Sequence, residues 1–96
     1  MNLKNRSAIS IIEKKVSVIG LGKSGYAATI LAHYLGGKVF ASDLGDTTEI
    51  LYRASQLRQQ GIKCETGQHS NQIYDADLWV VSPGIPKEAD IIIEAQ

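Results

Sequence analysis

The chain of 96 residues is long enough for one domain with its own hydrophobic core. Its ten basic and ten acidic side chains cancel, which argues against nucleic acid or an acidic membrane surface as the partner. The single cysteine, Cys64, cannot form an internal disulfide, and no apolar run approaches the ~18 residues that a membrane-spanning helix needs. The apolar run after Lys4 and Arg6 is also shorter than the ~7–15 residues of a secretory signal. We therefore expect a cytoplasmic protein that contacts neither nucleic acid nor membrane.

The first part of the chain predicts a strand, a helix and a second strand after an irregular start. Residues 1–14 show no regular hydrophobic period, and we expect them to form a tail or lead-in. The run KVSVIG (15–20) is short and rich in β-branched residues, as buried strands are. Apolar residues then recur at helical spacing until Gly36 and Gly37, which are typical of a helix end. A second strand is expected at 38–43.

The rest of the chain continues the same alternation of helices and strands. The next expected element is a helix with Thr47 and Thr48 as candidate N-caps, an apolar stripe from Ile50 to Leu57 and an end at Gly61. A short strand at 62–66, a brief helix at 70–76 and a clear strand at 77–82 are expected after it. The segment SPGIP then breaks the last strand, and ADIIIEAQ (89–96) is expected to begin a further helix.

This alternation predicts a Rossmann-like α/β fold, with parallel strands joined by right-handed crossovers in the spatial order 3-2-1-4. A complete doubly wound sheet continues to a fifth and usually a sixth strand, and no such strand is expected here. Residues 15–96 are therefore expected to form a truncated domain, either an engineered fragment or the opening domain of a longer enzyme.

Two phosphate-binding motifs compete for GLGKSG (20–25). A P-loop ending in Lys23 and Ser24 needs its first glycine at position 17, where the sequence has Ser17 in the middle of the expected strand. A P-loop also needs several loop residues between strand and helix, and here the strand leads directly into Gly20. The spacing therefore excludes an ATP-binding P-loop at this position.

The alternative motif, G-x-G-x-x-G, fits both the spacing and the surroundings. Gly20 would allow a tight turn, Gly22 a close approach of backbone to ligand, and Gly25 close packing of helix on sheet. The amides at the helix start would attract an anion, with a cation from Lys23 and a hydroxyl from Ser24. The same turn also occurs for purely structural reasons, and a lysine at a helix start is often only solvated. The motif favours a nucleotide-type ligand.

Two further segments are expected to face the same crevice. Asp43 ends the second strand, where its carboxylate is placed to accept from a ribose hydroxyl or a base N–H. A cap of the next loop is the alternative role for this residue. The segment SPGIP (82–86) follows the fourth strand and restricts the backbone around Gly84 with two prolines. Strands one and four are neighbours in the predicted order, so Ser82 and the amides after Pro83 would meet the glycine-rich turn at the switch point of the sheet.

Other candidate residues are interpreted more simply. His69, in the polar loop after the third strand, is placed to touch a ligand, but a loop histidine is usually solvated. His33 is expected at the surface, and Cys64 and Trp79 are expected to pack in the interior. Asp75 and Asp77 flank a turn. We find no metal-binding cluster and no catalytic triad by spacing.

Four stretches together resemble the N-terminal domain of the Mur ligases. They are VIGLGKSG at 18–25, SD at 42–43, the GI…G-x-H stretch at 61–69 and AD-L-x-VVSPGIP at 76–86. The resemblance covers residues 14–96. LGKSG with SPGIP is most similar to the glutamate-adding branch, whereas SDL (42–44) is also similar to the alanine-adding branch. It implies a domain that holds the uridine diphosphate end of UDP-N-acetylmuramoyl-L-alanine.

The resemblance also implies which residues contact that ligand. The glycine-rich loop beside the diphosphate would consist of Gly22, Lys23, Ser24 and Gly25. The uracil-side edge would consist of Asp43, Leu44 and the backbone of Gly45. The loop that closes on the uridine would consist of Ser82, Pro83 and Gly84. Family members usually have a basic or polar residue after the aspartate. Leu44 therefore leaves only backbone contacts at that position.

In the family, ATP phosphorylates the substrate carboxylate, Mg²⁺ offsets the phosphate charge, and the amino group of the incoming amino acid, here D-glutamate, attacks the acyl phosphate. The ATP and amino-acid sites lie in other domains, so the resemblance implies that this chain binds substrate without catalysis and holds no cofactor or metal. The glycine turn and Asp43 would look the same in an NAD(P)-dependent oxidoreductase, which is the main alternative. A non-catalytic nucleotide-sensing domain is a further alternative.

Overall fold

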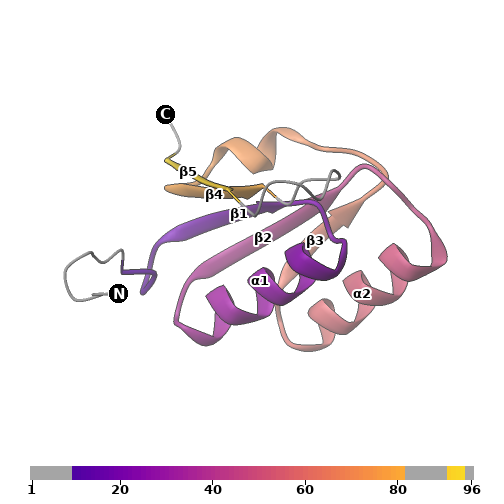
Figure 1. Cartoon of the computed structure of the whole chain (residues 1–96), viewed down its shortest axis with the longest axis horizontal. Helices are drawn as coiled ribbons and strands as arrows, with labels where there is room; N and C mark the ends of the chain where they lie inside the picture. Colours follow the sequence, from indigo (N-terminus) through magenta and orange to yellow (C-terminus); the bar gives the residue numbers. More distant parts are fainter. Residues whose placement is uncertain (1–9, 82–90, 95–96) are drawn as a thin grey trace.

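A computed structural model describes residues 10–81 and 91–94 of the chain, and Figure 1 shows how its elements are arranged. In chain order they are β1 (Lys15–Ile19), α1 (Lys23–Tyr34), β2 (Lys38–Asp43), α2 (Thr48–Gln59), β3 (Lys63–Thr66), the 3₁₀ helix η1 (Asn71–Tyr74), β4 (Leu78–Val81) and β5 (Ile91–Glu94). The strands form one sheet in the order β3-β2-β1-β4-β5. Strands β1 to β4 are all parallel, which confirms the predicted order 3-2-1-4.

The expected helix at 89–96 is wrong, because residues 91–94 form strand β5, antiparallel to β4. Three consecutive isoleucines explain the difference, since β-branched side chains favour strands over helices. A short apolar run does not distinguish the two by its periodicity. The backbone of β5 pairs with β4 on the side away from β1, where β4 would otherwise present unpaired N–H and C=O groups.

The hydrophobic core lies between the sheet and the two helices, which Figure 1 shows on the same face of the sheet. Strand register places the core there, because residues paired across strands point to the same side of the sheet and every second residue faces the helices. The buried apolar residues of this layer are Val16, Val18, Leu21, Ala32, Val39, Ala41, Ala54, Leu57, Ile62 and Leu78. The N-cap of α2 is Thr47, one of the two threonines expected there, and its hydroxyl accepts from the Ile50 amide at 3.2 Å.

Cys64 is half-buried against this core, broadly as expected of a small hydrophobic residue. Its thiol contacts the carbonyl oxygen of Ala54 at 3.5 Å. Burial raises the pKa of the Cys64 thiol, an effect that Arg58 partly opposes. The raised pKa keeps the thiol protonated and unreactive at neutral pH.

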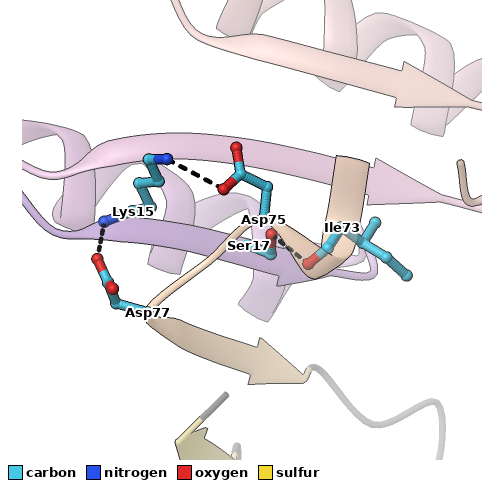
Figure 2. A network of polar contacts seen from close by, with 5 residues as sticks. All are labelled: Lys15, Ser17, Ile73, Asp75 and Asp77. Carbon is cyan, nitrogen blue, oxygen red and sulfur yellow. Dashed lines mark hydrogen bonds and ion pairs between the residues drawn. The ribbon is translucent and has the colours of Figure 1, made fainter. Parts of the chain in front are cut away.

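The 3₁₀ helix η1 is attached to the sheet through one carbonyl oxygen. Ser17 alternates with Val16 and Val18, so it points away from the helices, and it is 1% exposed. Its hydroxyl donates to the Ile73 carbonyl at 2.9 Å (Figure 2), and the Trp79 indole donates to the same oxygen at 2.9 Å. A buried hydroxyl and a half-buried indole N–H are thereby both satisfied.

The amino-terminal end of β1 is fixed by two aspartates that follow η1 (Figure 2). The amide of Lys15 donates to Asp77 Oδ2 at 2.9 Å, and the Asp77 amide donates to the Lys15 carbonyl at 2.8 Å. The ammonium of Lys15 lies 3.0 Å from Asp75 Oδ1. Asp75 and Asp77 therefore align the start of β4 beside β1.

Candidate ligand-binding site

The glycine-rich turn between β1 and α1 is held rigidly by its neighbours. Gly20 has a φ of 104°, a conformation that favours glycine, which confirms the tight turn expected there. Its amide donates to the Ser42 carbonyl at 2.8 Å, and the next side chain, Leu21, is fully buried. Helix α1 then begins at Lys23 with Gly22 as its N-cap, which has no side chain to cap the first amides.

No residue in the described part of the chain fills the space over Gly22. Its φ of −66° suits any residue, and a Cβ built there would meet nothing within 4 Å. Neither backbone conformation nor packing against the described residues therefore requires glycine at this position. Lys23 and Ser24 are both exposed, while Gly25 is buried, as expected if it lets α1 pack closely on the sheet. The turn thus leaves room beside a helix N-terminus, where backbone amides favour an anion.

Asp43 joins the turn after β1 to the loop after β2. Its Oδ2 accepts from the Leu21 amide at 2.6 Å and its Oδ1 from the Gly45 amide at 2.7 Å. The Asp43 carbonyl accepts from the Gly67 amide at 2.8 Å, which attaches the loop after β3 as well. The interpretation of Asp43 as a cap of its own loop is therefore confirmed. Each carboxylate oxygen keeps a further lone pair, so the predicted contact with a ligand stays a prediction.

Arg53 is a residue that the sequence did not indicate. It lies on α2, and its Nη1 donates to the Leu21 carbonyl at 3.1 Å. The guanidinium therefore places a permanent positive charge beside the glycine-rich turn. Its contact joins residues far apart in the chain, and no local pattern distinguishes Arg53 from the other charged residues of α2.

A polar cluster lies at the carboxyl end of β2, directly before Asp43. The fully buried Ser42 hydroxyl lies 2.8 Å from Glu65 Oε2, 3.2 Å from the Gln68 carbonyl oxygen and 2.7 Å from His69 Nδ1. Glu65 Oε2 also accepts from the Ser70 amide at 2.7 Å. The sequence indicated His69 only as a loop histidine, and it gave no sign of Ser42 and Glu65 as its partners.

The hydrogen bonds of this cluster determine the charge of Glu65. Burial works to raise the pKa of Glu65, but bonds from the Ser70 amide and the Ser42 hydroxyl, with a further effect of His69, outweigh it. The pKa of Glu65 is therefore held below its ordinary value. Glu65 is an ionised acceptor at neutral pH.

Of the remaining predicted residues, some lie within the described part of the chain and others lie outside it. Leu44 is 65% exposed, and its neighbour Gly45 lies against Asp43. Ser82, Pro83 and Gly84 lie outside the described residues, so their convergence on the turn stays a prediction. Strand β4 ends at Val81, which is paired with Ile19 directly before the glycine-rich turn.

A cavity of about 440 Å³ opens at the opposite end of the strands and includes none of the predicted residues. It is lined in part by Lys15, Lys38 and Phe40, close to the amino ends of β1 and β2. Parallel α/β sheets bind ligands at the carboxyl ends of their strands, so we do not assign the site there. Within the described residues, no cluster of three or more His, Cys, Asp or Glu is placed to hold a metal, and no helix has the length and hydrophobicity to cross a membrane.

Comparison with known proteins adds a specific likeness. Residues 14–96 match the family described as Mur ligase MurD-like, N-terminal domain. The UDP-N-acetylmuramoylalanine–D-glutamate ligase of Chloroherpeton thalassium is 40% identical over 79 residues, which is 82% of this chain and 17% of that protein. The enzyme of the same name from Pelodictyon phaeoclathratiforme is 45% identical over 83 residues, or 86% of this chain and 18% of that protein. The chain therefore spans less than a fifth of the length of these relatives.

Among solved structures, a bacillithiol disulfide reductase from Bacillus cereus matches 90% of this chain and 28% of its own. Its TM-score is 0.49 and its sequence identity 17%, a likeness too slight to bear on function.

Proposed function

The chain belongs to the MurD-like N-terminal domain family of the Mur ligases, and from that membership we propose that it binds the uridine diphosphate end of UDP-N-acetylmuramoyl-L-alanine. The parent enzyme would add D-glutamate to this substrate in peptidoglycan precursor synthesis. The observation that carries the proposal is the family match over residues 14–96, combined with an open glycine-rich turn at the start of α1. Family membership also favours the ligase over an NAD(P)-dependent oxidoreductase.

We propose that the diphosphate lies over the glycine-rich turn. A helix N-terminus without a side-chain cap offers backbone amides to an anion, and Gly22 leaves the space to reach them. Lys23 would supply a mobile cation and Ser24 a hydroxyl, while Gly25 keeps the helix close to the sheet. Arg53, bonded to the Leu21 carbonyl, adds a second positive charge nearby, which supports an anionic ligand.

We propose that the uracil and ribose lie along the loop after β2. The Asp43 carboxylate retains lone pairs for an N–H or O–H donor, and its bonds to Leu21 and Gly45 hold it in one orientation. The backbone of Leu44 and Gly45 would form the edge of this pocket. In the same proposal, Ser82, Pro83 and Gly84 close on the uridine from the neighbouring strand.

We propose that the remaining parts of the reaction belong to the rest of the parent enzyme. ATP with Mg²⁺ would supply the phosphoryl group that activates the substrate carboxylate, and D-glutamate would supply the attacking amine. The residues of this chain would bind and orient the nucleotide without making or breaking bonds. A cytoplasmic location follows from the same proposal, because its nucleotide substrates are made there.

Calorimetric titration of the chain with UDP-N-acetylmuramoyl-L-alanine, UDP and NADH tests this function. We expect saturable binding of both uridine ligands at one site and none of NADH. UDP should bind more weakly than the full substrate, because it lacks the muramyl contacts. Saturable binding of NADH alone would overturn the proposal in favour of the oxidoreductase.

A further inference from the structure

We propose that His69 is a positioning residue of the uridine-binding site, with a proton on Nδ1 that it donates to Ser42. The inference rests on the proposed function, because it concerns how the site that would receive uridine is held in shape. His69 lies in the loop after β3, and the proposed function gives it no contact with the ligand.

Counting protons around Ser42 establishes the direction of the bond. The hydroxyl has one proton to donate and two lone pairs with which to accept. Two of its neighbours, the carboxylate oxygen of Glu65 at 2.8 Å and the carbonyl oxygen of Gln68 at 3.2 Å, can only accept. The single Ser42 proton is therefore committed to that side, and the bond to Glu65 is the shorter one.

The remaining neighbour must then be the donor. His69 Nδ1 lies 2.7 Å from the Ser42 oxygen, too close for two groups that both lack a proton between them. If the ring carried its proton on Nε2 alone, the bare Nδ1 would compete with Glu65 for the same hydroxyl proton. A proton on Nδ1 gives the Ser42 oxygen a donor without competing for its proton, and in the neutral ring it leaves Nε2 as a hydrogen-bond acceptor.

This bond connects His69 to the residue proposed to contact the uridine. Ser42 is fully buried and directly precedes Asp43, whose carboxylate is bonded to the amides of Leu21 and Gly45. The Gly67 N–H is shared between the carbonyl oxygens of Asp43 and Gly45, which also attaches the loop carrying His69 to the loop after β2. Losing the donor at Nδ1 would leave the buried hydroxyl short of a partner and loosen the strand end that holds the Asp43 carboxylate.

Nitrogen NMR of the His69 ring tests the inference directly on the unchanged chain. Measured at pH 8, the ring should show a proton on Nδ1, whereas His33, which is exposed on α1, serves as the reference. A bare Nδ1 in His69 would overturn the proposal. This NMR measurement needs no ligand, so it tests the position of the His69 proton even if the chain fails to bind uridine nucleotides.

A pair of substitutions then tests the positioning role. In His69→Asn the side-chain amide nitrogen can take the place of Nδ1, whereas in His69→Gln it takes the place of Nε2. We expect His69→Asn to bind UDP nearly as well as the unchanged chain, and His69→Gln to bind about tenfold more weakly, the usual cost of one unsatisfied buried group. The matched pair His33→Asn and His33→Gln should leave UDP binding unchanged. Equal UDP affinities of the two His69 variants would overturn the positioning role, and absence of UDP binding by the unchanged chain would instead count against the proposed function.

Discussion

Gly22 and Gly20 are glycines for different reasons. Gly20 adopts a backbone conformation that disfavours a side chain, whereas Gly22 has an ordinary conformation and open space around it. The described residues alone therefore explain Gly20 but not Gly22. A ligand whose phosphate oxygens approach the backbone would explain the second glycine.

Replacing Gly22 with alanine should separate binding from folding. The new methyl group would occupy the space proposed for the diphosphate, so we expect UDP affinity to fall about tenfold or more, or ~1.4 kcal/mol. Stability should fall by no more than about 1 kcal/mol, the scale of a poorer N-cap. Titration calorimetry and urea unfolding measure the two effects, with Ser55→Ala on the exposed side of α2 as the control. Unchanged UDP affinity in Gly22→Ala would place the diphosphate elsewhere.

Single residues were predicted from the sequence only where a local pattern marked them. The glycine motif identified the turn, and the position of Asp43 at a strand end identified its place at the edge of the sheet. The partners of Asp43, and the role of Ser42, depend on contacts between residues far apart in the chain. Spacing along a sequence carries no signal for such contacts.

At the scale of elements, α2 contacts the glycine-rich turn through Arg53, whereas Arg58 nearer its carboxyl end contacts β3. Arg53 donates to the Leu21 carbonyl at 3.1 Å, and Arg58, nearer the end of the helix, donates to the Cys64 carbonyl at 3.0 Å. The two arginines make the same kind of bond, but only the first touches the glycine-rich turn. They therefore form a natural pair for an experiment.

We expect Arg53→Met and Arg58→Met to lose similar stability but to differ in binding. Methionine keeps the length of the apolar stem and removes the charge and the bond, at a cost of about 1 kcal/mol in the free energy of unfolding for each variant. Only Arg53→Met should weaken UDP binding, because it frees the turn and removes a positive charge beside it. Urea unfolding and calorimetry provide the two measurements. Equal losses of UDP affinity would show that Arg53 has no special connection to the site.

The last strand shows where element prediction from sequence reaches its limit. The helices and the parallel strands follow from clear periodicity, caps and glycine stops. The isoleucine run of β5 has no such period, and its conformation depends on the pairing available at the edge of β4. That information belongs to the sheet and is absent from the segment itself.

At the scale of the whole molecule, the parallel arrangement brings the carboxyl ends of β1 to β4 to the same edge of the sheet. The order 3-2-1-4 was predictable because right-handed crossovers leave few ways to connect alternating strands and helices. The interlocking of the loops after β1, β2 and β3 was not predictable, because it depends on side chains such as Asp43 and Glu65. The free energy of unfolding should therefore depend on the charge of the carboxylates that join these loops.

Acid should weaken the folded chain partly through Glu65. Its pKa in the folded chain is lowered, so its contribution to stability is present above the pKa of the unfolded chain and is lost as the pH falls through the folded pKa. We expect Glu65→Gln to be less stable than the unchanged chain at pH 7, with the difference shrinking below about pH 4.3. Urea unfolding between pH 7 and pH 3 measures this, with Glu49→Gln on the exposed side of α2 as the control. A stability difference that stays constant over this range would contradict the assigned charge of Glu65.

Trp79 gives the molecule a built-in optical probe. It is the only tryptophan of the chain, its indole N–H is bonded to the Ile73 carbonyl, and the ring of Tyr74 lies 5.6 Å from its own between centroids. Its fluorescence, including energy transferred from nearby tyrosine, therefore depends on whether η1 stays attached to β4. Release of that short helix can be followed in real time without a label, two residues away from the point where β4 ends beside the glycine-rich turn.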